Sequence, residues 1–308
     1  MLFLFGKARA ERLDREGRKA ARTRTLWGDA LKRLSKNKLA VLALIWILFM
    51  GIVALTGRIW VPQVFGEVVY TDSSTATLTS KLKPSLEHPF GTDLLGRDVL
   101  GRIAYGAGVS LAIGILATLI STSIGIVLGS LAGYFGGLID SLVMRVTDTF
   151  MAVPYTLFTI ALIAVLGPGW INVFLAIGLL GWTSICRVVR SAILQIKEND
   201  YIAAAKALGA SNLRIILRHI LPNSMASVVV YSTMSIGSAI LSEAALSYLG
   251  LGVQQPQPSW GVMISEGQTF LQTHPWLVFC PGAAILTTVL AFTLLGDGLR
   301  DALDVKGT

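Results

Sequence analysis

One apolar segment of this chain carries a row of hydroxyl side chains that could bind a ligand or line a path. Tyr231, Ser235, Ser238 and Ser242 recur at steps of three and four residues, the spacing that places side chains on one face of a helix. Such hydroxyls can line a hydrated path, or they can donate back to carbonyl groups of their own helix. Both interpretations stay open from the sequence.

One carboxyl accompanies this row. The apolar segment that begins at Asn223 carries one charged side chain, that of Glu243. At about 1.5 Å per helical residue, Glu243 lies roughly 30 Å from Asn223, near the far end of a membrane span. An acid in such a segment is a functional hypothesis. A hydrogen-bonding role at the outer rim is the alternative.

The sequence lacks the usual motifs of catalysis and nucleotide binding. It contains no GxxxxGK[ST], GxSxG or HExxH string, so we expect no ATP site, no catalytic centre and no cofactor on this chain. The histidines His88, His219 and His274 are scattered, and no metal site is predicted. Cys186 and Cys280 are expected on opposite faces of a membrane, so we predict packing roles and no disulfide.

The elements that position these residues are long apolar runs. Only 14% of the 308 residues are charged and 53% are hydrophobic, whereas soluble domains carry about 25% charged residues. A run of roughly 20 apolar residues crosses a bilayer core. The charge-free run from Thr149 to Cys186 is about twice that length, so we fold it at Gly167-Pro168-Gly169. The sequence predicts an all-α membrane protein with six transmembrane helices: 39–58, 107–132, 143–166, 170–189, 223–249 and 277–297.

The basic residues set the orientation. Six spans place both termini on one side, and 21 of the 26 Lys and Arg residues then fall on that side. Loops rich in Lys and Arg stay in the cytoplasm, so both termini are predicted to be cytoplasmic. The net charge of +8 is assigned to topology and anionic lipid, and not to nucleic acid. No cleavable signal peptide is expected, because the apolar stretch at 1–5 is short and precedes the basic residues.

The segments outside the spans carry their own signals. In the basic tail 1–38, the helical spacing of Trp27, Leu31 and Leu34 predicts an amphipathic helix at the cytoplasmic interface. The alternative is a cluster of basic residues that only marks the cytoplasmic end of the first span. In the outer loop 59–101, the sequence HPFGTDLLGRDVLGR predicts an ordered element, because Thr92 or Asp93 can cap a short helix there.

A row of glycines marks a close helix contact. Gly125, Gly129 and Gly133 recur every four residues along the second span, and small residues at this spacing let two helix backbones approach. The partner helix belongs either to a second membrane subunit or to this chain. We favour packing within the chain.

The polar stretch 197–223 is too charged for a span and carries helix signals. Asp200 is expected to cap a helix over 201–208, and Gly209 to end it in the left-handed conformation.

A second short helix is predicted to follow. Ser211 is expected to cap it over 212–220, and Pro222 to end it as the fifth span begins. Its bulky residues should pack against the ends of the spans: Leu213, Ile216 and Leu217.

Several strings together resemble a known family. AAAKALGASNLRIILRHILPN (203–223) is similar to the cytoplasmic EAA loop of ABC importer permeases. From about residue 26 to the end, the chain resembles the second permease of the dipeptide/oligopeptide/nickel branch. The strings that carry this resemblance are LWGDALKRLSKNKLAVLAL (26–44), HPFGTDLLGRDVLGRIAYGAGVSL (88–111), GYFGGLIDSLVMRVTD (133–148), SEAALSYLGLGVQQPQPSWG (242–261) and LLGDGLRDALD (294–304).

The resemblance implies a type I ABC importer permease fold. It divides the chain into the tail 1–38, a first helix 39–58, the extracytoplasmic loop 59–101 and a permease core 102–308 with a coupling loop at 190–222. Two positions depart from the family pattern: Ala203 stands where Glu is usual, and His219 where an apolar residue is usual. The implied coupling residues are Asp200, Tyr201, Ala203, Ala204, Ala205, Lys206, Gly209, Ala210, Ser211, Leu221 and Pro222.

The resemblance also implies a function. The chain would be a multi-pass permease subunit of a bacterial inner membrane, importing di- or oligopeptides. Its implied partners are a second homologous permease, two ATPase subunits that hold ATP and Mg, an extracytoplasmic solute-binding protein and the lipid bilayer, with no nucleic acid. The hydroxyl row and Glu243 become a candidate translocation path. The candidate contacts with the binding protein are Asp93, Arg97, Asp98, Gln254 and Trp260.

Other functions stay open. Permeases for nickel chelates or glutathione-like peptides share these motifs. A secondary transporter driven by an ion gradient and a membrane scaffold without transport are alternatives of another class.

Overall fold

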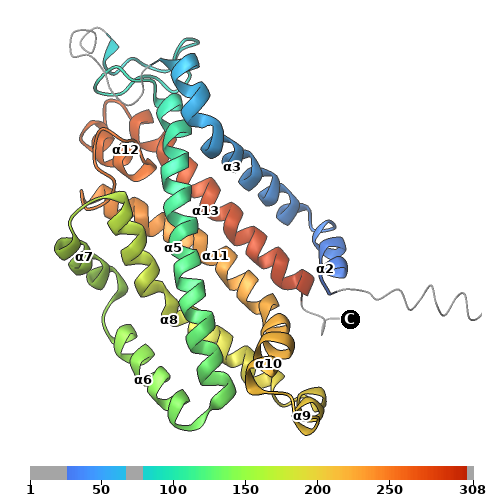
Figure 1. The fold of residues 1–308 in the computed structure, drawn as a ribbon. Coiled ribbons are helices and arrows are strands. Elements are labelled where there is room, and N and C mark those ends of the chain that lie inside the picture. Colours follow the sequence, from blue (N-terminus) through green and yellow to red (C-terminus); the bar gives the residue numbers. More distant parts are fainter. Residues whose placement is uncertain (1–25, 67–78, 304–308) are drawn as a thin grey trace, which may run out of the picture.

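A computed structural model describes residues 26–66 and 79–303, and within them the chain is helical, with one isolated antiparallel bridge between Thr92 and Asp98. The stretch 7–24, whose charged and Ala-rich sequence predicts a frayed or surface helix, lies outside the described residues. Figure 1 shows long helices in a tilted bundle, in which α2 lies beside the end of α13. The helices are α2 Leu26–Leu34, α3 Lys38–Phe65, α5 Val99–Phe135, α6 Gly137–Ala152, α7 Tyr155–Leu166, α8 Trp170–Ile196, α9 Asp200–Ala207, α10 Asn212–Ile215, a π-helix Ile216–Ile220, α11 Leu221–Tyr248, α12 Trp260–Gly267, a 3₁₀ turn Gln268–Phe270 and α13 Trp276–Leu303.

The number of spans agrees with the prediction, but the third span is not one helix. Five helices of the described chain are long and apolar enough to cross a bilayer, and α6 with α7 makes a sixth span only as a pair bent by 85°. The prediction of one continuous helix over 143–166 is therefore wrong. Pro154 disfavours the helical conformation of the residue before it, and Val153 is extended at φ −90° and ψ 131°.

The fifth span begins earlier than predicted. Pro222 does not end the preceding helix, because Asn212 to Tyr248 form one continuous helical path through the π-helix Ile216–Ile220. Pro222 lies at the start of α11 directly after the π-helix, and local π-helical geometry re-satisfies the backbone groups that a proline leaves free in a membrane helix.

The glycine row of α5 packs against α8 of the same chain. A β-carbon at Gly125 would lie 2.7 Å from a side-chain carbon of Ile185, and one at Gly129 would lie 2.7 Å from the carbonyl oxygen of Cys186. Larger residues would therefore push the two helices apart. The favoured interpretation, packing within the chain, is confirmed for this row, and α5 and α8 form the most extensive helix pair of the described fold.

The remaining spans cover the other side of α5. Buried residues of α3, α5, α11, α12 and α13 form one core cluster, which includes Trp260, Ile240 and Phe292. The predicted amphipathic helix is α2, in which Leu34 is buried and packs against α13, whereas Leu31 is 66% exposed. Trp27 lies outside the side chains that the structure describes.

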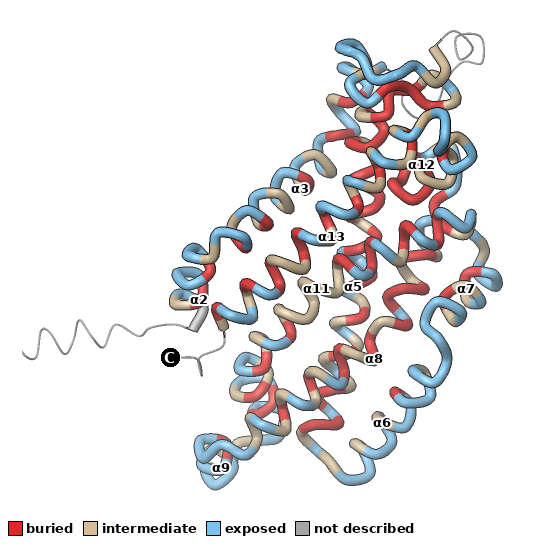
Figure 2. Tube along the Cα trace, turned by 180° about the vertical axis from the view of Figure 1, so that it is seen from behind, coloured by how far each residue is buried: buried red, intermediate tan, exposed pale blue. Residues whose placement is uncertain are grey.

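The bent span is the least covered part of the bundle. Figure 2 shows α6 as mainly exposed, and Thr147 is its one buried residue. A span that crosses a membrane with so few contacts in its own chain needs other partners to hold it in place.

Candidate functional site

The polar stretch 197–223 forms a hairpin between α8 and α11 (Figure 1). Gly209 ends α9 with φ +78°, as predicted. The predicted cap is wrong by one residue: Asn199 occupies the position before α9, without a side-chain cap bond, and Asp200 is the first helical residue. An acid in the first turn still favours the helix through its dipole.

Isoleucines anchor this hairpin to the spans. Ile202, Ile215 and Ile220 are all 0% exposed and pack with Ile193 of α8 and Val228 of α11. This corrects the packing prediction for the second helix: Ile216 is buried as expected, but Leu213 and Leu217 are 66% and 55% exposed. The residues that face α8 and α11 are the buried ones. The exposed side carries apolar residues that no described part of the chain covers: Leu208, Leu213 and Leu217.

Two ion pairs connect α8 to α6 just before the hairpin. Arg190 donates to both carboxylate oxygens of Asp140, at 2.5 Å from Nε and 2.6 Å from Nη2. Arg187 contacts Asp148 through a single 2.5 Å interaction, and both side chains of this pair are more exposed than those of the Arg190–Asp140 pair. Sequence reasoning did not single out these four residues, although Asp140 and Arg190 are charges at the ends of apolar runs. Two-point arginine pairs fix orientation as well as distance.

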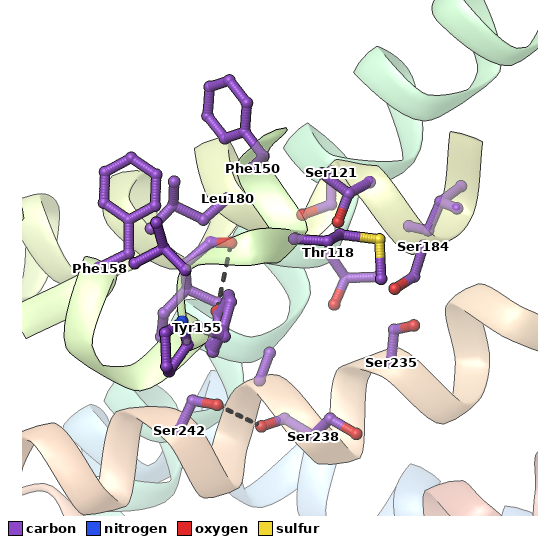
Figure 3. Close-up of a pocket in the computed structure, with 18 of the residues that line it drawn as sticks. Thr118, Ser121, Phe150, Tyr155, Phe158, Leu180, Ser184, Ser235, Ser238 and Ser242 are labelled. Carbon is purple, nitrogen blue, oxygen red and sulfur yellow. Dashed lines mark hydrogen bonds between the residues drawn. The ribbon is translucent and has the colours of Figure 1, made fainter. Parts of the chain in front are cut away.

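A cavity of about 400 Å³ lies among α5, α6, α7, α8 and α11. Of the five predicted path residues, Tyr231, Ser235, Ser238 and Ser242 line it. The two interpretations of the row, a lining of a cavity and bonds back to the same helix, are both correct, since Ser235 and Ser242 also donate to carbonyl groups one turn earlier on α11. Figure 3 shows that the cavity is completed by residues from other helices that the sequence analysis did not assign to the path: Thr118, Ser121, Phe150, Tyr155, Phe158 and Ser184.

These additional lining residues carried only weak signals. Thr118 and Ser121 are three residues apart on α5, a spacing compatible with one polar face. Tyr155 enters through the bend at Pro154, and no periodic pattern predicts the direction of a bend.

Glu243 does not line this cavity. Glu243 lies near the end of α11 at Tyr248, as expected, but it is buried at 0% exposure and does not lie on an exposed rim. Its carboxyl accepts hydrogen bonds from Ser110 of α5 at 3.2 Å and from Ser247 at 2.7 Å. Ser110 in turn accepts from the amide of Trp260. The carboxyl therefore links α5, α11 and the start of α12.

Replacing Glu243 by Leu is expected to destabilise the protein by about 1–3 kcal/mol for each hydroxyl left without its acceptor. Glu243→Gln keeps one acceptor oxygen and should lose less. The thermal unfolding midpoints of the purified variants in detergent test this order. Equal midpoints for wild type, Gln and Leu would contradict a structural role of the carboxyl.

A buried ionic cluster organises the end of the bundle opposite α9 (Figure 1). Arg102 Nη1 lies 2.5 Å from Asp93 and 2.6 Å from Glu266, while Arg97 Nε lies 2.7 Å from Asp93. The expected cap is also corrected: Asp98, and not Thr92 or Asp93, caps a helix, and that helix is α5.

Most of the residues that were predicted to contact the binding protein are buried. Asp93, Arg97, Asp98 and Trp260 are at most 5% exposed, so their side chains support this end of the bundle from inside. Gln254 is exposed. Direct contact through the four buried side chains is therefore not supported, and the loops that they hold are the accessible surface.

Comparisons with known proteins identify relatives of this chain. Residues 125–306 match the sequence model of the binding-protein-dependent transport system inner membrane component, and residues 25–79 match that of the N-terminal TM domain of oligopeptide transport permease C. The chain is 44% identical over 282 residues to the dipeptide transport system permease protein DppC of Alkalihalophilus pseudofirmus, covering 91% of this chain and 90% of that protein.

Two further relatives and one solved structure extend the comparison. The oligopeptide transport system permease protein OppC of Bacillus subtilis is 42% identical, with 92% of this chain and 90% of that protein covered. The glutathione transport system permease protein GsiD of Escherichia coli is 42% identical, with 94% and 93% covered. An inward-facing MetNI methionine ABC transporter chain shares the fold at TM-score 0.55 and 18% identity, covering 66% of this chain and 96% of that one.

The matches to the two sequence models and the identity to the relatives show to which family this chain belongs. The described helices supply five to six apolar spans, as a multi-pass protein of a bacterial inner membrane requires. The chain therefore belongs to the family of inner membrane components of binding-protein-dependent transport systems, and it is a transport permease subunit of an ABC importer.

Proposed function

We propose that this chain is one of two permease subunits of an importer for di- and oligopeptides. In this proposal, α9 and α10 dock on an ATPase subunit that holds ATP and Mg, and a second homologous permease completes the path. An extracytoplasmic solute-binding protein delivers the substrate to the outer loops. The relatives named for dipeptide and oligopeptide transport support the substrate class.

The observation that carries the coupling role is the two-sided hairpin. Its inner side is fixed to the spans by Ile202, Ile215 and Ile220, which are fully buried. Its exposed side presents small residues of α9 together with Leu208, which is 88% exposed. A rigid element with an exposed apolar tip is suited to dock into a groove of a soluble partner. Since Ala203 replaces the family's usual Glu, we propose that docking relies on shape more than on charge at that position.

The pair Arg190–Asp140 gives the hairpin a connection to the cavity. Motion of the end of α8 would pull on α6, whose other end contributes Phe150 to the cavity wall. The pair is about 20–30% exposed at its side chains, so it retains part of the strength of a charge-assisted bond.

We expect Asp140→Ala to lower import per ATP hydrolysed about fivefold, which corresponds to about 1 kcal/mol of lost coupling. Exchanging the charges in Asp140→Arg with Arg190→Asp should recover much of the loss. Asp148→Ala is the matched control, because its pair with Arg187 is 63% and 48% exposed, and exposed pairs contribute little. Import and ATP hydrolysis are measured together in proteoliposomes. Equal effects at both aspartates would contradict this transmission route.

The outer surface is assigned to the binding protein. The loops at 88–102 and 250–261 lie at the opposite end of the bundle from α9. Single cysteines at exposed positions such as Gln254 should cross-link to the binding protein when substrate is present. Cross-links only to cytoplasmic proteins would overturn the proposed orientation.

Purification of the chain tests the proposed function most directly. An ATPase should co-purify with the wild-type chain, and deletion of 199–210 should abolish that association while the chain still inserts. Peptide import should require ATP. Import driven by an ion gradient without ATP would favour a secondary transporter, and an insertion-competent chain that transports nothing would favour a scaffold.

A second substrate class rests on a specific relative. The 42% identity to the glutathione transport system permease supports glutathione-like peptides as the alternative cargo. Competition between a tripeptide and glutathione for import by the same complex separates the two.

A further inference from the structure

The cavity among α5, α6, α7, α8 and α11 is uncharged. Its lining includes hydroxyls from α5, α7, α8 and α11 and aromatic rings from the bent span, with no Asp, Glu, Lys, Arg or His among the lining residues (Figure 3). A cavity of this composition offers hydrogen bonds and apolar contact without a fixed charge. The inference below rests on the proposed function, because it concerns what this cavity takes from an imported peptide.

Four of the hydroxyls have already used their only hydrogen. Ser121 donates to the carbonyl oxygen of Gly178 at 2.8 Å, which connects α5 to α8. Ser235 and Ser242 donate to carbonyls of α11 at 2.8 and 2.9 Å. The phenol of Tyr155 donates to a carbonyl of α8 at 3.5 Å. A hydroxyl carries one hydrogen and two acceptor lone pairs. Toward the cavity, these groups therefore act as acceptors.

A fifth hydroxyl has no partner in the described part of the chain. Thr118 Oγ1 is buried without a hydrogen bond there, in a residue that is 5% exposed, and Thr118 lines the cavity. A buried hydroxyl without a partner costs free energy. A ligand with hydrogen-bonding groups along its length would satisfy this hydroxyl as well as the acceptor row.

The opposite wall is aromatic. The ring centroids of Phe150 and Phe158 are 5.7 Å apart, and Phe150 also meets Trp182 edge-on at 5.7 Å. This wall gives apolar contact to side chains of any shape and holds no partner for a carboxylate. Tight binding would slow release from a transport path, so contacts of modest strength suit passage.

We propose that this cavity is a transient subsite for the peptide backbone, in which the hydroxyls of Ser121, Ser235 and Ser242 accept hydrogen bonds from the amide N–H groups of the peptide. The aromatic wall contacts the side chains without selecting among them. The substrate class is therefore a peptide rich in amide N–H groups, and the cavity holds no charged side chain that would bind an anionic or a cationic group.

The test combines variants of this chain with peptides that lack one donor. The full complex, with both permeases, the ATPase subunits and the binding protein, is reconstituted in proteoliposomes. Initial import rates are measured for trialanine and for trialanine methylated at one amide nitrogen at a time. Ser121→Ala, Ser235→Ala and Ser242→Ala are compared with Ser123→Ala. Ser123 makes the same type of backbone bond on α5 but is exposed and does not line the cavity.

Each lining variant should import trialanine about two- to tenfold more slowly, which is the range expected for one lost hydrogen bond. For at least one methylated peptide, the same variant should cause no further loss, because the donor is already missing. Ser123→Ala should import at the wild-type rate. The preference of the binding protein cancels, because every ratio compares permease variants with the same peptide and the same binding protein.

The proposed function and the backbone subsite can be overturned separately. If the wild-type complex imports no peptide at any binding-protein concentration, the proposed function and this inference are both overturned. If the wild-type complex imports trialanine but the serine variants match Ser123→Ala, or if serine removal and methylation lower the rate independently for every peptide, only the subsite is overturned. Thermal unfolding of each variant must match wild type, and where an alanine variant unfolds early, Ser→Cys at the same position replaces it in the comparison.

Discussion

Replacing Gly209 by Val is expected to leave the permease inserted in the membrane but to lower substrate import per ATP hydrolysed by about tenfold or more. Gly209 has φ +78°, a conformation that costs a residue with a β-carbon about 1–2 kcal/mol, and a β-branched residue more. No atom lies within 4 Å of a β-carbon built at this position, so the penalty is conformational and not steric. Val would relieve it by changing the angle between α9 and α10, and the docking surface would lose its shape.

The control for this prediction is Gly209→Asn. Asn is larger than Gly but tolerates the left-handed conformation. If backbone conformation is what matters, Asn should retain much more coupling than Val, measured as import and ATP hydrolysis in the same proteoliposomes. If docking instead requires an empty space at this position, Asn and Val should fail alike. Wild-type coupling with Val would contradict the lever altogether.

Replacing Arg102 by Met is expected to cost about 3–5 kcal/mol of stability, the range found when one member of a buried ion pair is removed. Arg102 is 1% exposed and contacts both Asp93 and Glu266. Met fills part of the same volume but leaves the two carboxylates with Arg97 as their remaining cation in this cluster. The outer loop 79–98 should then separate from α12, and the protein should become sensitive to protease at its outer end.

The matched control is Lys83→Met, which removes one positive charge from an exposed position of the same outer loop. Exposed substitutions change stability by about 0.5 kcal/mol or less. Thermal unfolding in detergent and protease digestion of spheroplasts measure the two variants side by side. Equal unfolding midpoints for Arg102→Met and Lys83→Met would show that the cluster contributes nothing beyond net charge.

Much of the candidate site was predictable because its signals are local. The hydroxyl row on α11 follows from spacing, since one helix face is fixed by 3.6 residues per turn. The left-handed turn at Gly209 follows from the residue type. By contrast, Leu213 and Leu217 were wrongly predicted to be buried, because the choice between two apolar faces of a short helix depends on which face meets the spans.

The sequence by itself determined the membrane class, the number of spans, the polar hairpin and its turn. Each of these depends on hydropathy and backbone preference over a few consecutive residues, and both act locally. Only the tertiary structure decided that Glu243 is buried, that Arg102 meets Glu266 from 164 residues away, and that hydroxyls of α5 and α11 share one cavity with the bent span. These depend on which helix faces meet, and that is set by close packing such as the glycine row against α8 together with the 85° bend at Pro154. No local pattern encodes the direction of such a bend or the partner of a buried charge.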